Sequence, residues 1–172
     1  MAPHRLCACL ITLTVLLCAA LLPGCGNSSV KDGGEWRTTI NNQPFTLKVS
    51  ASDPTRQRGL GGVTDIPADG GMVFVFPEAQ YHNFYMKDCV TNMDIVFLDS
   101  LGYITAIYTM TQEPLQGPNE TTKQYEERLR RYNSLSKAQF VLELREGRAK
   151  ELGLKTQQKL PLDFETLKTA AQ

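Results

Sequence analysis

An uncharged apolar run over Leu6–Leu22, closed by the tetrapeptide Leu22–Cys25, sets the first part of this chain apart from any folded domain. Arg5 precedes the run, and proline and glycine follow it, which is the order of parts in a secretory signal. The cysteine at the break identifies the tetrapeptide as a lipobox, in which Cys25 is lipidated and begins the mature protein. We therefore expect residues 1–24 to be a signal peptide and the remainder to lie on a membrane surface outside the cytoplasm.

Two alternatives fit the same apolar run. An uncleaved membrane anchor is one, because a spanning helix needs about 20 apolar residues and this run has 17. An ordinary secretory signal without lipid is the other. The lipobox is favoured because a thiol stands at the cleavage point, and two or more acyl chains on Cys25 would anchor the protein firmly. Gly26, by resemblance to bacterial lipoproteins, favours the outer membrane where one exists.

Length and charge limit the classes of protein that the remainder can be. Removing 24 of 172 residues leaves 148, which suits one domain. The chain has 18 basic and 18 acidic residues, and because only Arg5 lies in the signal, the mature part carries 17 against 18, or −1. A nucleic-acid binder would need a basic excess, so we expect no nucleic-acid partner.

The cysteines give the domain no disulfide. Four of the five lie in the signal or at its end: Cys7, Cys9, Cys18 and Cys25. Cys89 alone cannot form an intrachain bridge, so stability must come from packing. A buried thiol is favoured over a nucleophile activated by His82, the one histidine of the mature chain. The scarcity of such ligands also predicts no metal site and no cofactor.

Residues 25–35 are polar and glycine-rich, which predicts a flexible tether between the lipidated cysteine and a single globular domain over residues 36–172. Met72–Phe76 is apolar at every position, as in a central strand covered on both faces. Asn41–Pro44 is typical of a hairpin turn. The predicted strands are Trp36–Ile40, Phe45–Val49, Met72–Phe76, His82–Lys87, Met93–Leu98, Tyr103–Met110, Phe140–Leu144 and Lys159–Leu162.

Four segments are expected to be helical: Asp53–Gly62, Thr121–Tyr132, Glu146–Leu152 and Asp163–Ala170. Many short strands at hairpin spacing with few helices indicate a mainly β (α+β) domain. We expect an antiparallel β-sandwich or distorted barrel with two to four short peripheral helices.

Four sequence blocks carry a resemblance: Arg58–Leu60, Gly71–Pro77, Phe84–Lys87 with Met93–Ile95, and Phe140–Leu144 followed by Gly147 and Leu152–Lys155. With these blocks the chain resembles the domain-of-unknown-function family 192, small bacterial and archaeal domains that are often exported, over residues 36–162. The resemblance implies a compact, mostly β sandwich-like fold and no established reaction.

The chain departs from that family's usual motifs at several positions: Gly61, Gly62, Tyr85, Asp88, Cys89, Asn92 and the pair Gln157–Gln158. Segment 112–131 is also longer than is typical, so a helix there is expected to be specific to a subgroup. Any site that the family shares can be altered in this chain.

Three charged residues stand in apolar surroundings: Lys87, Asp94 and Glu143. Burying an ionised group is costly unless it is paired. Strand alternation places Asp94 on the same strand face as Val96, and it places Glu143 on the face opposite Leu142. Lys87 and Asp94 flank a short turn-like stretch, which lets them approach each other. A structural ion pair is the favoured interpretation. The alternative is a polar pocket that grips an anionic or hydroxyl-rich ligand.

The resemblance adds further candidates for ligand binding: Tyr85, and Tyr132 with Ser134, which match the family's tyrosine-x-serine. Aromatic residues are also candidates for a platform under a sugar ring, although core packing is favoured for them: Trp36, Tyr81, Phe84 and Tyr85.

Three hypotheses for function remain. The favoured one is a lipid-anchored exported domain that binds a small ligand, an envelope polymer or a protein without catalysis. The second is an enzyme acting on carbohydrate or cell-wall material through Lys87, Asp94 and Glu143. No catalytic residue is assigned, because the sequence has no recognisable nucleophile and base. The third is a structural component of the cell envelope.

Overall fold

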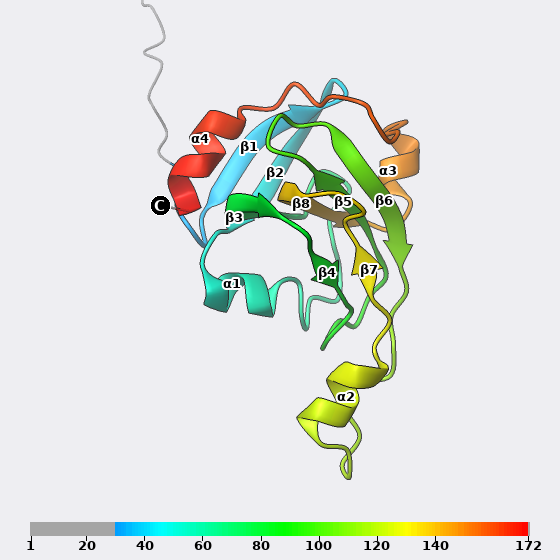
Figure 1. Ribbon diagram of the computed structural model, residues 1–172. Helices are drawn as coiled ribbons and strands as arrows, with labels where there is room; N and C mark the ends of the chain where they lie inside the picture. Colours follow the sequence, from blue (N-terminus) through cyan, green and yellow to red (C-terminus); the bar gives the residue numbers. More distant parts are fainter. Residues whose placement is uncertain (1–29, 172) are drawn as a thin grey trace, which may run out of the picture.

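The computed structural model describes residues 30–171, in which a six-stranded sheet has the order β1-β2-β3-β8-β5-β6 (Figure 1). Its strands are β1 (Glu35–Ile40), β2 (Gln43–Ser50), β3 (Met72–Gln80), β5 (Met93–Leu98), β6 (Ile104–Met110) and β8 (Ala138–Arg145). A second, two-stranded sheet pairs β4 (Asn83–Phe84) with β7 (Tyr132–Asn133). The expectation of a mainly β domain is confirmed, and the large sheet is not closed into a barrel.

One strand pair in the large sheet is parallel. β2 and β3 run in the same direction, whereas every other neighbouring pair is antiparallel. A parallel pair needs a long crossover connection, and here the connection contains helix α1 (Asp53–Arg58). The sheet is therefore mixed, and the crossover places α1 over one of its faces.

The turn between β1 and β2 follows directly from its two asparagines. Asn41 and Asn42 have φ values of 44° and 64°, and Ile40 pairs with Gln43. Asparagine tolerates this left-handed backbone better than most residues, which suits a two-residue turn of type I′. The hairpin is tighter than predicted, because β2 already begins at Gln43.

All four predicted helices are present, and each is shorter than its sequence pattern: α1, α2 (Thr122–Arg128), α3 (Arg148–Glu151) and α4 (Phe164–Lys168), which continues into the 3-10 turn η1 (Thr169–Ala171). Ser52 and Thr121 cap α1 and α2 through reciprocal bonds with the residue three positions later.

Two of the predicted strands are almost entirely absent from the structure. Of the strand predicted over His82–Lys87, only β4 forms, because the chain turns at Asp88, which has a φ of 57°. Of the strand predicted over Lys159–Leu162, only one β-bridge forms, between Lys159 and Tyr103.

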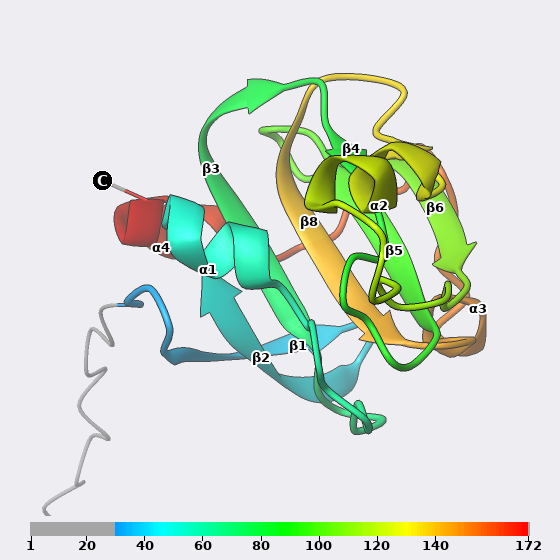
Figure 2. The same cartoon turned by 90° about the horizontal axis from the view of Figure 1, so that it is seen from below.

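Figure 2 gives a second view of the sheet, turned by 90°. An apolar core lies on each face of the sheet. Along β8, Leu142 and Leu144 point into the first core, which α3 and α4 cover. Val141 points into the second core, on the side of α1 and the β4–β7 sheet. β8 is buried on both faces because one of the two cores packs against each of them, and β3 and β5 cover its edges.

Candidate functional site

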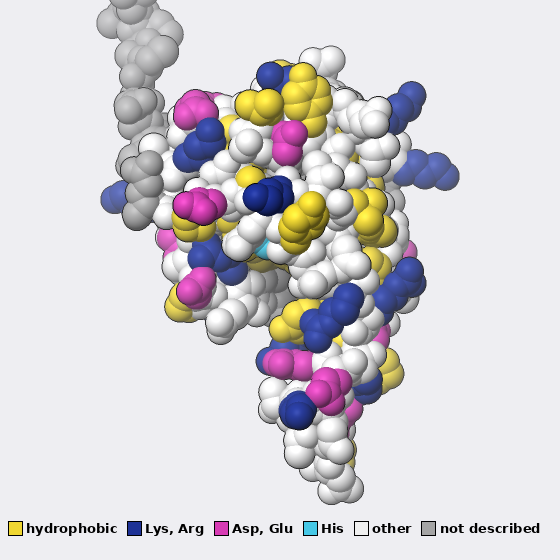
Figure 3. Space-filling view, viewed as in Figure 1, with side chains coloured by type: hydrophobic (Ala, Val, Ile, Leu, Met, Phe, Trp, Pro, Cys, Tyr) yellow, Lys and Arg dark blue, Asp and Glu magenta, His cyan; other side chains and the backbone are white. Residues whose placement is uncertain are grey.

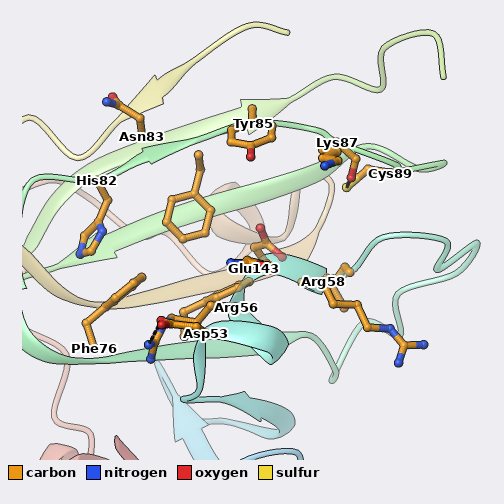
Figure 4. Close-up of a pocket in the computed structure, with 15 residues that line it drawn as sticks. Asp53, Arg56, Arg58, Phe76, His82, Asn83, Tyr85, Lys87, Cys89 and Glu143 are labelled. Carbon is orange, nitrogen blue, oxygen red and sulfur yellow. Dashed lines mark hydrogen bonds and ion pairs between the residues drawn. The ribbon is translucent and has the colours of Figure 1, made fainter. Parts of the chain in front are cut away.

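A pocket of about 240 Å³ opens on the second face, between α1, the centre of the sheet and the segment around β4 (Figure 4). Its lining joins aromatic rings to polar side chains. The aromatic rings are those of Phe74, Phe76, Phe84 and Tyr85, and the polar side chains include Asp53, Arg56, Arg58, His82, Asn83, Lys87 and Glu143. Concave sites that combine apolar walls with a few polar groups are typical of small-ligand binding.

Glu143 supplies the most unusual group in this pocket. Strand β8 holds it in register between Met72 and Ile95, at the centre of the sheet. The residue is only 6% exposed, and its Oε2 has no hydrogen-bond partner among residues 30–171. Burial raises the pKa of Glu143 to about 8. The side chain is therefore a neutral carboxylic acid at pH 7, able both to donate and to accept a hydrogen bond.

Lys87 and Tyr85 line the same pocket from the segment that follows β4. Lys87 Nζ lies 2.5 Å from Glu126 Oε1, and this hydrogen bond raises the pKa of the ammonium group. The guanidinium of Arg131 lies 4.0 Å from the centre of the Tyr85 ring. Both pocket residues are thus held from outside the sheet, by the segment that contains α2.

Asp94 lies on the opposite face of the sheet. Its carboxylate accepts a 2.8 Å bond from Thr109 Oγ1 and another of 2.8 Å from the Ala149 amide in the first turn of α3. The expected approach of Lys87 to Asp94 is wrong, because the intervening turn carries Lys87 to the pocket face. Lys87 and Glu143 share the pocket, while Asp94 fixes α3 against the sheet.

Tyr132 and Ser134 are buried and lie outside the pocket lining. The Tyr132 hydroxyl accepts a 3.3 Å bond from the Thr111 amide. Ser134 Oγ accepts a 3.1 Å bond from the His82 amide and donates one of 2.6 Å to the Ser136 carbonyl. Ser134 therefore contributes to the site only by positioning His82.

The aromatic platform does not form as a unit. Trp36 packs in the first core, on the far side of the sheet from Phe84. Tyr81 is 71% exposed and lies outside the pocket lining. Only Phe84 and Tyr85 of the proposed set face the pocket, where Phe84 is held edge-to-face against Phe74 at 5.1 Å.

Arg56 and His82 are pocket residues that sequence reasoning missed. Arg56 pairs with Asp53 at 2.6 Å and donates a 2.9 Å bond to the Val75 carbonyl. Burial lowers the pKa of His82, and its Nε2–H donates a 3.0 Å bond to the Ala138 carbonyl. No local signal marks these residues, because only the crossover of α1 and the path of the chain after β3 bring them to the pocket.

Cys89 is a buried thiol, as predicted. Burial raises its pKa to about 12, so the protonated form dominates at neutral pH. Its Sγ lies 3.5 Å from the Lys87 carbonyl oxygen, within reach of a weak S–H donor. Cys89 therefore packs beside the pocket and has none of the features of an activated nucleophile.

A metal-binding cluster and a membrane-spanning helix are both absent from the described part of the chain. Within residues 30–171, no group of three or more histidine, cysteine or acidic residues is placed to hold a metal ion. No helix in this part of the chain has the length and apolar character needed to cross a bilayer. Leu6–Leu22 and Cys25, on which the signal and lipidation hypotheses depend, lie outside these residues.

An arm containing α2 projects from the domain and touches the pocket segment (Figures 1 and 3). Tyr125 is fully buried, and its hydroxyl accepts a 2.9 Å bond from the Asp88 amide. Charges of both signs cover the arm, and Arg128 pairs with Glu120 at 2.6 Å. The arm thus braces the segment that carries Tyr85 and Lys87.

Two solved structures share this fold. A candidate transcription regulator from Sinorhizobium meliloti 1021 has a TM-score of 0.59 and 23% identity, covering 77% of this chain and 96% of that one. A protein of unknown function from Novosphingobium aromaticivorans DSM 12444 has a TM-score of 0.57 and 19% identity, covering 73% of this chain and 82% of that one. At these identities the likeness shows the fold alone. No curated protein matches the chain.

A family of uncharacterized proteins, DUF192, described as uncharacterized ACR, matches residues 36–162. The matched span contains the six strands of the large sheet from Trp36 onward and every residue that lines the pocket. It confirms the family suggested by the four sequence blocks. This chain belongs to the DUF192 family.

Proposed function

We propose that this protein is a lipid-anchored, exported binding protein that holds a small ligand in the pocket around Glu143 without transforming it. The observation that carries the proposal is the buried, unpartnered carboxyl group at the pocket. A polar group buried without a partner lowers stability by about 1–3 kcal/mol, which a bound ligand can recover. Aromatic walls and a neutral hydrogen-bonding group suit recognition of a small molecule.

Binding is favoured over catalysis by the state of the thiol, the imidazole and the amine that line the pocket. Cys89 is a protonated thiol, and the Nε2–H of His82 is committed to a backbone carbonyl. The hydrogen bond to Glu126 holds Lys87 in its charged form, so it lacks the free amine of a base or nucleophile. Asp94, the third member of the hypothetical catalytic set, lies on the other face of the sheet.

The proposed anchor is compatible with an open pocket. The described chain begins at Val30, which packs in the first core. The pocket opens on the second face. Within the tether proposed over residues 25–35, Val30 therefore meets the domain on the face away from the pocket.

Cys25→Ala tests the anchor. We expect the full-length protein to lose radiolabelled palmitate and to move from the carbonate-washed membrane fraction into the soluble fraction. Cys18→Ala is the matched control, since its thiol lies inside the apolar run, and it should stay membrane-bound. Tight membrane attachment of the Cys25→Ala protein would contradict lipid anchoring.

Tyr85→Ala tests the pocket, because Figure 4 shows the Tyr85 ring directed into it and the substitution would remove that wall. The mature lipoprotein in nanodiscs would be screened by calorimetry against monosaccharides, disaccharides, amino acids and aromatic acids. At least one class should bind the unchanged protein, and Tyr85→Ala should weaken that binding about tenfold or more. Tyr81→Ala, at an exposed tyrosine outside the lining, should bind normally. Failure of every compound, or equal binding by both variants, would overturn the proposal.

A further inference from the structure

We propose that the ligand is a single-ring hydroxycarboxylate, with its hydroxyl group at Glu143 and its carboxylate at the mouth of the pocket near Arg58. This inference rests on the proposed binding function and specifies the class of ligand. Three features carry it: one uncharged hydrogen-bonding group inside, flat walls, and a surplus of positive charge outside.

The interior of the pocket selects an uncharged hydrogen-bonding group. Figure 4 shows the Glu143 carboxyl group between α1 and the side chains of Tyr85 and Lys87. Because this carboxyl group is buried and uncharged at pH 7, a ligand carboxylate beside it would be desolvated without a counter-charge. A hydroxyl group avoids that cost, and it can accept from the acid O–H or donate to its carbonyl oxygen.

The walls select one flat ring. The imidazole of His82 stacks on Phe76 with centroids 3.8 Å apart, and Phe84 is fixed edge-on by Phe74 at 5.1 Å and Phe97 at 5.5 Å. Rings held in this way lose little freedom when a ligand packs against them. The pocket volume of about 240 Å³ is smaller than the roughly 300–1,000 Å³ of sites for drug-sized ligands. One ring with two substituents fits this space better than a disaccharide.

The mouth selects an anion. Asp53 neutralises Arg56, and Glu126 neutralises Lys87. Arg58 lines the pocket and is exposed, and its guanidinium has no ion pair or hydrogen bond within the described residues. Figure 4 shows its guanidinium directed outward from the pocket. One uncompensated cation remains at the mouth, which matches a ligand with a single negative charge and disfavours an amine.

Calorimetry with three related probes tests this assignment on the mature lipoprotein in nanodiscs at pH 7. The probes are 4-hydroxybenzoate, benzoate, which lacks the hydroxyl group, and phenol, which lacks the carboxylate. We expect 4-hydroxybenzoate to bind at least about tenfold more tightly than either partial probe, because each lacks one of the two polar contacts.

Variants assign each preference to its residue. Glu143→Leu should abolish the preference for 4-hydroxybenzoate over benzoate and keep the preference over phenol. Arg58→Gln should do the reverse, and Glu143→Gln, which retains a donor and an acceptor, should keep both. Melting curves of each variant confirm that it is folded.

Two negative results have different meanings. Equal affinity for the three probes, or preferences that survive both substitutions, would overturn the hydroxycarboxylate assignment. If other compounds of the wider screen still bind and Tyr85→Ala still weakens their binding, the binding function stands without this ligand class. If nothing in the screen binds, the binding function itself fails.

Discussion

Glu143→Gln is expected to abolish most of the loss of stability that the unchanged domain shows as the pH rises from about 5 to about 8. In the folded protein, burial raises the pKa of this carboxyl group from 4.5 to about 8. In the unfolded chain it titrates near its ordinary value of about 4.3. Between these values the folded state holds a proton that the unfolded state has released, so stability falls with rising pH. Glutamine does not titrate, so this contribution disappears.

Urea unfolding at pH 5, 6.5 and 8 measures the effect. The difference between Glu143→Gln and the unchanged protein should grow in favour of the variant across this range, by an amount on the order of several kcal/mol. Below the unfolded pKa and above the folded pKa the difference should be constant. Glu127→Gln, which changes an exposed carboxyl group on α2, is the control and should leave the pH profile unchanged. Parallel profiles for Glu143→Gln and the unchanged protein would show that Glu143 is not buried as described.

Gly71→Ala is expected to lower the free energy of unfolding by about 3 kcal/mol or more. Gly71 precedes β3 with a φ of 140°, and a Cβ there would lie 2.2 Å from the Glu143 carbonyl oxygen. The Gly71 carbonyl also accepts a 2.9 Å bond from the Lys48 amide. Because the opposing atom belongs to the backbone of β8, relief of the clash would require β3 to move away from β8.

Gly153→Ala separates the clash from backbone strain. Gly153 also has a positive φ, 65°, but a Cβ there would meet no atom within 4 Å. Its substitution should cost only the left-handed penalty of about 1–2 kcal/mol. Chemical denaturation of both variants provides the comparison. Equal losses would mean that β3 and β8 do not approach as closely at Gly71 as the structure indicates.

Local sequence pattern was enough to predict the six strands of the large sheet and the four helices, but not β7. Met72–Phe76 and Met93–Leu98 are apolar over their full lengths, and both are buried strands near the sheet centre. The parallel pairing of β2 with β3 was not predictable, because it depends on which strand edges meet after the crossover. The short β4 was overestimated, since the turn at Asp88 forms through tertiary contacts such as the bond to Tyr125.

The candidate site was only partly predictable, because it depends on the alignment between strands as well as on the pattern within each strand. Alternation within one strand correctly placed Asp94 with Val96, and Glu143 opposite Leu142. It did not show how the two strands align. In the sheet Asp94 pairs with Leu144 and Ile95 pairs with Glu143, so the two acids point to opposite faces. The register between strands almost 50 residues apart in sequence decided which charges share the pocket.

The position of β8 has a consequence for the order of folding. β8 lies between β3 and β5, yet it is the last of the six sheet strands to be synthesised. Until residues 138–145 are available, the β1–β2–β3 half and the β5–β6 half have no strand to join them. Long-range pairing of this kind is slow to form. For an exported chain, as proposed above, this arrangement delays formation of the complete sheet and the pocket until residues 138–145 have been synthesised.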